Sequence, residues 1–195
     1  MDNNDNLHEI PKAFFSVELP YVCPETYVVA ILCDSAQTFC PKLNEGYKEI
    51  RTKRGKIYVH EKHGKTERKK NVATARYFAE KYGHKIWLLP NPDDVKSPDV
   101  FNETLGVFQE YKEPISNRAT AIVHAIHFAG KQADNVVLTV NPRISLESLR
   151  WAINNETKRT KNIQKVTIIR NNKDLTYTRT EIIAKGFKII QDDFK

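Results

Sequence analysis

The sequence predicts an α/β or α+β fold, in which helices cover the faces of a mixed β-sheet. From about residue 65 onward, helix-spaced and strand-like apolar patterns follow one another in the order helix, strand, hairpin, helix, strand, helix, strand. Residues 135–140, NVVLTV, are nearly all apolar, which is typical of a central strand covered on both faces. With 40% hydrophobic and 28% charged residues, the composition is that of a globular protein. Helices and strands that alternate in this way pack as layers around a common core.

Residues 1–44 differ from the rest of the chain. They contain four of the nine prolines and all three cysteines, and residues 1–41 carry a net charge of −5. We therefore predict a partly stranded N-terminal extension over residues 1–44 and one domain over residues 45–195. The absence of C-x-x-C spacing favours reduced thiols, and the alternative is a zinc site completed by His60 or His63. The cysteines are Cys23, Cys33 and Cys40.

The sequence predicts neither a membrane segment nor a signal peptide. No run of about 18 apolar residues, the minimum for a spanning helix, is present. The N-terminus, MDNNDNLHEIPK, is polar and acidic, without the basic and apolar regions of a secretory signal. We therefore expect a cytoplasmic protein.

The first elements of the domain are two strands, a helix and a third strand. Residues 47–60 read as two short strands around a turn at Gly55. A helix is predicted from Lys65 to about Tyr82, and Gly83 is the glycine that typically ends such a helix. Residues 84–90, HKIWLLP, then form a short buried strand. The helix residues expected to face the core are Val72, Ala75, Phe78, Ala79 and Tyr82.

A hairpin follows, with strands at Asp99–Phe101 and Val107–Lys112 and a turn at Thr104–Leu105. The rest of the domain alternates again between helices and strands. The predicted elements are a helix from the N-cap Ser116 to about Gln132, the strand at 135–140, a helix from Ser145 to Thr157, and strands at 165–170 and near 175–179.

The hairpin brings two carboxylates together. Side chains alternate across a strand, so Glu110 and Lys112 share one face. With the turn at Thr104–Leu105, residues whose numbers add up to 209 are opposite each other, which pairs Asp99 with Glu110. Carboxylates in directly opposite positions repel each other, and a cation between them removes the repulsion.

These residue types are suited to phosphodiester hydrolysis. Mg²⁺ is commonly held by one or two carboxylates and several waters, and it polarises a phosphodiester and its bound water. Lys112, two residues beyond Glu110, can orient the attacking water and stabilise charge on the phosphate. A third carboxylate is available from the first helix. At 100° per residue, Glu67 lies about 20° from Phe78, on the apolar face, whereas Glu80 points toward solvent.

The spacing also matches a known family. Pro98-Asp99, ten residues, and then Glu110-Tyr111-Lys112 match the motif of PD-(D/E)XK nucleases. From about Lys65 to Arg170, the chain resembles the tRNase-type nuclease domain at the C-terminus of contact-dependent growth inhibition toxins, which is also found in mobile elements. The matching pieces are a helix with an early Glu, AEKYGHKIWLLP, SPDV, QEYKEPIS, AGKQADNVVLTV and SLESLRWAINNETKRTKNIQKVTIIR.

The resemblance implies a restriction-endonuclease-like core and a role for each matching residue. Asp99 and Glu110 would hold Mg²⁺ or Mn²⁺, with Zn²⁺ as an alternative. Lys112 would be the catalytic lysine, Glu67 the helical acid, and Gln132 an accessory residue. The partners implied are RNA, tRNA-like in particular, or DNA, and an immunity or inhibitor protein.

The charge distribution favours nucleic acid as the partner. Residues 42–85 and 143–179 carry net charges of +9 and +6 and flank residues 86–142, which carry −3. Phosphates attract Lys and Arg, while a metal site requires carboxylates. The alternative is that these are solvated faces of a basic protein. The candidate phosphate contacts are Arg51, Lys53, Arg54, Lys56, Lys69, Lys70, Arg150, Lys158, Arg159 and Lys161.

Each assignment has a structural alternative. Glu110 and Lys112 could be charges that protect a sheet edge, and Glu67 a solvated carboxylate at a helix N-terminus. Gln132 could simply end a helix, and His60 and His63 are expected at the surface. The alternative to a nuclease is a non-catalytic protein of a mobile element that binds nucleic acid or has a structural role. The sequence leaves the oligomeric state open.

Overall fold

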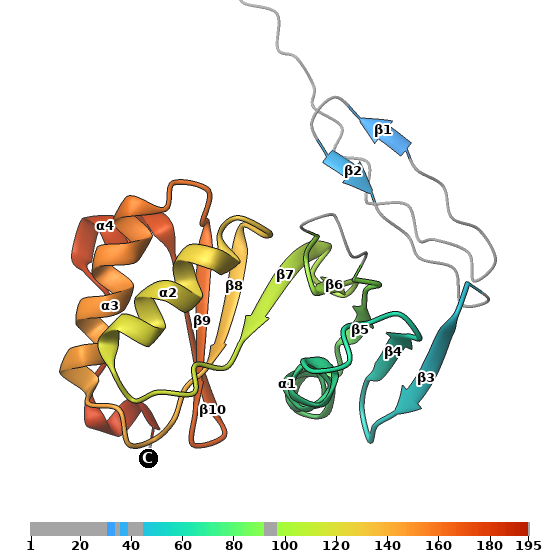
Figure 1. The fold of residues 1–195 in the computed structure, drawn as a ribbon, viewed down its shortest axis with the longest axis horizontal. Helices are drawn as coiled ribbons and strands as arrows, with labels where there is room; N and C mark the ends of the chain where they lie inside the picture. Colours follow the sequence, from blue (N-terminus) through green and yellow to red (C-terminus); the bar gives the residue numbers. More distant parts are fainter. Residues whose placement is uncertain (1–30, 34–35, 39–44, 92–96, 195) are drawn as a thin grey trace, which may run out of the picture.

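The computed structural model describes residues 31–33, 36–38, 45–91 and 97–194, and its centre is an eight-stranded mixed sheet with four α-helices (Figure 1). The strand order is β10-β9-β8-β7-β6-β5-β4-β3. The elements are β3 (Tyr47–Arg51), β4 (Lys56–His60), α1 (Arg68–Tyr82), β5 (Lys85–Leu88), β6 (Val100–Asn102), β7 (Val107–Lys112), α2 (Ala119–Ala129), β8 (Asn135–Thr139), α3 (Leu146–Arg159), β9 (Lys165–Arg170), β10 (Lys173–Thr178), α4 (Arg179–Lys185) and a 3₁₀ helix, η1 (Gln191–Phe194). The predicted fold class, a mixed sheet flanked by helices, is confirmed.

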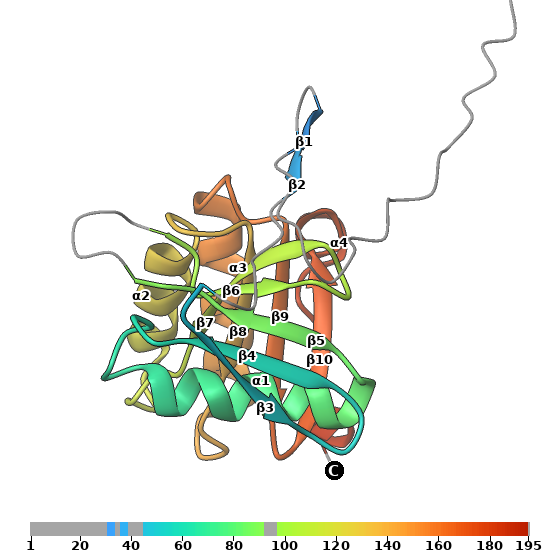
Figure 2. The same cartoon turned by 90° about the vertical axis from the view of Figure 1, so that its right-hand side faces the viewer.

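Helices cover both faces of this sheet. Alternation along β8 places Val136 and Leu138 in a core with α2, α3 and α4, and Val137 in a second core with α1. Figure 1 shows α2, α3 and α4 on one side of β8–β10 and α1 on the other. In Figure 2, α1 runs along β4 and β5, with which it is in contact. Parallel pairing of β7, β8 and β9 matches the nearly all-apolar sequence of β8.

The hairpin of β6 and β7 has the predicted register but a longer loop. Val100 pairs with Gln109 and Asn102 with Val107, so partner numbers add up to 209. The loop spans the four residues 103–106 rather than two, and Gly106 has a φ of +64°, which glycine adopts without strain. Asp99 is therefore opposite Glu110, as expected, and Thr104 and Leu105 lie at the centre of the turn that the Gly106 N to Glu103 O bond closes, although the loop is longer than predicted.

The helix boundaries are partly as predicted. Gly83 ends α1 with a φ of +75° and donates its N–H to Ala79 O, and Ser145 caps α3 by accepting from Ser148 N. The prediction that Ser116 caps α2 was wrong, because Arg118 is the N-cap and Ser116 Oγ only accepts a bond from Arg118 N. The prediction that Tyr82 faces the core was also wrong, since this residue is 44% exposed.

One helix was missed. In α4, Thr178 Oγ1 accepts from Glu181 N, and Glu181 Oε2 accepts from Thr178 N, a reciprocal capping box. The sequence TRTE carries this signal, and the seven-residue helix that follows is too short to show a clear apolar period.

Little of the predicted N-terminal extension lies within the described residues. The short strands β1 (Ile31–Cys33) and β2 (Ala36–Thr38) pair antiparallel. Cys23 and Cys40 are outside the described residues, and the boundary between residues 44 and 45 stays a prediction. Among the helices that the structure describes, none is long and apolar enough to cross a membrane.

Candidate active site

The two carboxylates of the hairpin lie side by side. Asp99 directly precedes β6, and Glu110 occupies the opposite position on β7. The Asp99 backbone N–H donates to Glu110 Oε2 (3.0 Å), and the Tyr111 backbone N–H contacts Asp99 Oδ2 at 3.4 Å. The strand pairing itself therefore fixes both carboxylates.

Glu110 is the centre of this cluster and is fully buried, with 0% of its surface exposed. Its Oε1 atom accepts from Lys112 Nζ (2.5 Å) and from Gln132 Nε2 (2.7 Å). Gln132 follows α2, so the prediction that it lies near the site is matched by a direct contact. With Oε2 bonded to Asp99 N, both oxygens of Glu110 are held in place.

Lys112 connects Glu110 to two further carboxylates. Its Nζ atom lies 3.9 Å from Asp99 Oδ2 and 3.9 Å from Glu67 Oε1. Glu67 is the N-cap residue of α1, and its side chain is 47% exposed, which places it at the rim. We call Glu67, Asp99, Glu110 and Lys112 the acidic cluster. The structure brings these four predicted residues together, and their chemical roles stay predictions.

The acidic cluster contains more carboxyl groups than ammonium groups, and this shifts the pKa values of its members. Burial raises the pKa of Asp99; Lys112 works against the rise and Glu67 adds to it. Burial, and then the Asp99 carboxylate, raise the pKa of Glu110 to about 8 although Lys112 opposes the shift. Burial would lower the pKa of Lys112, but Glu110 and the other carboxylates raise it overall. Three carboxylates thus share one ammonium group.

The donor atoms suit a hard divalent cation. Two carboxylates, Asp99 and Glu110, face each other, and Mg²⁺ typically binds one or two carboxylates with water completing its shell. Within the described part of the chain, no three His, Cys, Asp or Glu side chains are arranged as a ready metal cluster. Asp99 and Glu110 are therefore the candidate ligands, and binding of Mg²⁺ or Mn²⁺ by this pair stays a prediction.

A buried histidine behind the acidic cluster was not predicted. His63 is only 2% exposed, so its expected surface position was wrong. Its Nδ1 bonds to Leu89 O (2.6 Å) and its Nε2 to Asn71 Nδ2 (3.1 Å), while Leu89 N donates to Asp99 O (2.9 Å). Because both ring nitrogens are engaged, His63 is poorly placed to complete the alternative zinc site. Its polar sequence context, EKHGKTE, gives no signal of burial.

The basic residues of the first block separate into two places. Lys69 and Lys70 lie in the first turn of α1, and Lys70 Nζ lies 3.7 Å from Glu113 Oε2, next to Lys112 in sequence. The turn between β3 and β4 instead lies at the opposite end of α1, where Arg54 Nη1 donates to Lys81 O. A 15-residue helix is about 22 Å long, so the turn is remote from Glu67. The residues at this turn are Arg51, Lys53, Arg54 and Lys56.

The second basic group also takes no part in the acidic cluster. Arg150, Lys158 and Arg159 are on α3, and Lys161 follows it, in the helix layer on the face of the sheet opposite α1 (Figure 1). None of the four takes part in the hydrogen bonds or ion pairs of the acidic cluster described above. Nucleic-acid contacts by these residues stay a prediction.

Comparisons with known proteins give little further information. No family model matches the chain, and no curated protein matches its sequence. Among solved structures, a CdiA-CT/CdiI toxin and immunity complex from Burkholderia pseudomallei has a TM-score of 0.41 and 18% identity, covering 58% of this chain and 82% of that chain. A likeness this weak carries no argument about chemistry.

Proposed function

We propose that this protein is a metal-dependent nuclease of the PD-(D/E)XK type, which hydrolyses phosphodiester bonds in RNA, tRNA-like RNA in particular, or in DNA. The observation that carries the proposal is the convergence of Asp99, Glu110 and Lys112 across the β6–β7 pair, with Glu67 at the rim. The unbalanced negative charge supports it, because pKa values raised by burial and by like charges are typical of functional carboxylates.

Each residue has a role that its position supports. Asp99 and Glu110 would hold the divalent ion, which when bound supplies Lewis-acid polarisation of the phosphate and of water. Gln132 donates to Glu110 and so keeps that carboxylate in one orientation. The Lys112 ammonium, kept in place by Glu110, offers a positive charge to the oxygen that develops charge on phosphate. Glu67, half exposed at the rim, can accept a proton from incoming water.

The direct test is a cleavage assay on several substrates. Purified full-length protein would be incubated with tRNA, single-stranded DNA and duplex DNA, each in Mg²⁺, Mn²⁺ or EDTA. We expect cleavage of at least one substrate with a divalent ion and none in EDTA. A Glu110→Gln variant, which keeps the size of the side chain but removes its charge, should lose the activity. Cleavage by the parent in EDTA, or undiminished cleavage by Glu110→Gln, would contradict the proposal.

A second candidate is a non-catalytic protein that binds nucleic acid or is a structural component of a mobile element. The specific observation in its favour is the short contact between Lys112 Nζ and Glu110 Oε1, which already gives the buried carboxylate one cation. Binding of the same substrates without cleavage under any metal condition would favour it. The immunity or inhibitor partner stays a prediction from the sequence resemblance.

A further inference from the structure

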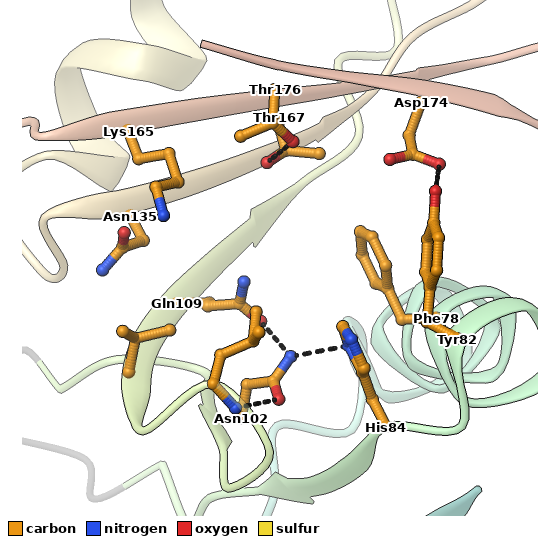
Figure 3. Close-up of a pocket in the computed structure, with 12 residues that line it drawn as sticks. Phe78, Tyr82, His84, Asn102, Gln109, Asn135, Lys165, Thr167, Asp174 and Thr176 are labelled. Carbon is orange, nitrogen blue, oxygen red and sulfur yellow. Dashed lines mark hydrogen bonds between the residues drawn. The ribbon is translucent and has the colours of Figure 1, made fainter. Parts of the chain in front are cut away.

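A separate cavity of about 210 Å³ is lined by residues of α1 and of the sheet, among them Gln109 (Figure 3). Gln109 and Glu110 are consecutive residues of β7, so their side chains point to opposite faces, and Gln109 lines the cavity. The cavity lies beside the C-terminal end of α1, and strands β6 to β10 line the rest of it. The sheet thus separates this cavity from the acidic cluster.

Gln109 presents a fixed donor to the cavity. The residue is only 6% exposed, and its Oε1 atom accepts from Tyr111 Oη (3.3 Å) and Asn102 Nδ2 (3.4 Å). Asn102 Oδ1 accepts from Leu105 N, so Asn102 turns its NH₂ group to Gln109; the amide oxygen of Gln109 therefore faces Asn102, and its NH₂ group faces the other way. In Figure 3 this nitrogen points into the cavity, and it has no hydrogen-bond partner among the described residues. Because Gln109 Nε2 is not among the buried polar atoms without a partner, this NH₂ group is accessible from the cavity and can donate to a ligand that offers an acceptor.

One wall of the cavity is aromatic. The rings of Phe78 and His84 are nearly parallel, with centroids 6.0 Å apart and an angle of 11°, and Tyr82 and His84 are 5.5 Å apart at 29°. Tyr82 Oη donates to Asp174 Oδ1 (2.7 Å), which holds the exposed tyrosine ring in place. Such a wall offers a π-face to a planar ring.

The remaining side of the cavity is polar, and Lys165 and Asp174 are the charged residues among those that line it. Thr167 Oγ1 and Thr176 Oγ1 are 2.9 Å apart, and only one of the two hydroxyl protons is used in their mutual bond. Lys165 directs its ammonium group toward the cavity from the side away from the aromatic wall (Figure 3). Pockets for drug-sized ligands measure about 300–1,000 Å³, so this smaller cavity has room for a single small ring.

We propose that this cavity binds one nucleobase, stacked on the aromatic wall and accepting a hydrogen bond from Gln109, with its phosphate at Lys165. A planar π-face, an acceptor edge and an attached anion occur together in a nucleotide, and each has its counterpart here. The nucleobase comes either from a free nucleotide or from a polynucleotide. The proposal does not depend on catalysis, because the cavity and the acidic cluster are on opposite faces.

Calorimetric titration of the full chain in EDTA tests this proposal without cleavage. The probes are the four nucleoside monophosphates, a set of tetranucleotides, and ribose 5-phosphate as the ligand without a base. We expect saturable binding of at least one mononucleotide or tetranucleotide and no comparable binding of ribose 5-phosphate. Binding of mononucleotides indicates that a free nucleotide suffices, and binding of tetranucleotides alone indicates a polynucleotide. No binding of any probe at millimolar concentration, or equal binding of ribose 5-phosphate, would overturn the proposal.

Variants locate the binding. Gln109→Glu keeps the size of the side chain but replaces the NH₂ donors with an acceptor oxygen, so affinity should fall about tenfold or more. Tyr82→Leu removes an exposed part of the aromatic wall and should also weaken binding. Near-UV circular dichroism shows whether Gln109→Glu is folded, and Tyr82→Leu tests the cavity by itself if it is not. Lys185→Ala, which changes a lysine of α4 outside the cavity, is the matched control and should bind like the parent. Unchanged affinity in Tyr82→Leu and in folded Gln109→Glu would place the ligand elsewhere.

Discussion

Two lysine–carboxylate clusters in this protein use the same residue types to opposite effect. In the first, Asp174 on β10 accepts three hydrogen bonds at Oδ1, from Tyr77 Oη (2.6 Å), Tyr82 Oη (2.7 Å) and Lys81 Nζ (2.7 Å). Burial alone would raise the pKa of Asp174, but these three donors lower it overall. The three hydrogen bonds therefore compensate the charge of the Asp174 carboxylate. They also connect α1 to β10 at the edge of the sheet.

The acidic cluster has the reverse balance. Asp99 and Glu110 are buried together and share Lys112, and the pKa of each is raised. Natural cores rarely keep two buried carboxylates with a single cation, because each uncompensated charge costs stability. Such an arrangement is typical of sites that bind a further cation or substrate. The comparison therefore supports a stabilising role for Asp174 and agrees with the functional role that we propose for the acidic cluster.

The largest expected difference between the clusters is in activity. Lys112→Ala should reduce turnover by about two to three orders of magnitude, because it removes a preorganised charge that acts on the phosphate. Lys81→Ala removes the matching lysine of the Asp174 cluster and should leave turnover unchanged. Single-turnover cleavage rates at saturating Mg²⁺ would compare the two. Equal cleavage rates for Lys112→Ala and the parent would show that Lys112 has no role in catalysis.

The next difference is in stability. Asp174→Asn keeps the shape of the side chain but removes the charge that three donors stabilise, so we expect a loss of about 1–3 kcal/mol in the free energy of unfolding. Chemical denaturation measures this loss, and cleavage activity should stay at the parent level. An unchanged free energy of unfolding would show that the Asp174 cluster is dispensable.

Asp99→Asn should change the free energy of unfolding in the opposite direction, toward higher stability. The asparagine can still accept from Tyr111 N, and removing one of two mutually repelling carboxylates relieves Glu110. We expect a gain of about 1 kcal/mol in the free energy of unfolding without metal, together with a loss of activity that added Mg²⁺ partly restores. A destabilised Asp99→Asn protein in EDTA would contradict the claim that the acidic cluster is under-compensated.

The pH dependence of stability sharpens the same contrast. The lowered pKa of Asp174 means that its contribution is present above the ordinary carboxyl pKa and is lost as pH falls through the lowered value. The raised pKa of Glu110 means that the folded state binds more protons than the unfolded state between about pH 4.5 and 8, so stability falls as pH rises. Denaturation in EDTA measures this contrast. The free energy of unfolding of Glu110→Gln should rise relative to that of the parent as pH rises toward 8. The free energy of unfolding of Asp174→Asn should come close to the parent value only at acidic pH. Parallel pH profiles would remove the contrast.

Local and pairwise patterns were enough to predict most of the fold and the position of the acidic cluster. Strand alternation and the hairpin register placed Asp99 opposite Glu110, and helical periodicity selected Glu67 over Glu80. The alternation of apolar helices and strands likewise indicated a sheet with helices on its faces, which the structure confirms.

Apart from the short helix α4, the features that were missed depend on contacts between distant parts of the chain. Lys81 and Asp174 are 93 residues apart, and His63 reaches Leu89 across 26 residues. No local pattern specifies such partners, because sequence periodicity describes faces of elements and not which faces meet. The Asp174 cluster and the histidine behind Asp99 could therefore be found only in the assembled structure.

The most direct test of the account is a calorimetric titration of Mn²⁺ into the parent and three variants. The under-compensated acidic cluster should bind one Mn²⁺ per chain in the parent. Glu110→Gln should abolish this binding, whereas Lys112→Ala and Asp174→Asn should retain it, because neither loses a carboxylate of the predicted ligand pair. Absence of saturable Mn²⁺ binding by the parent, or its survival in Glu110→Gln, would contradict the claim that Asp99 and Glu110 form a metal site.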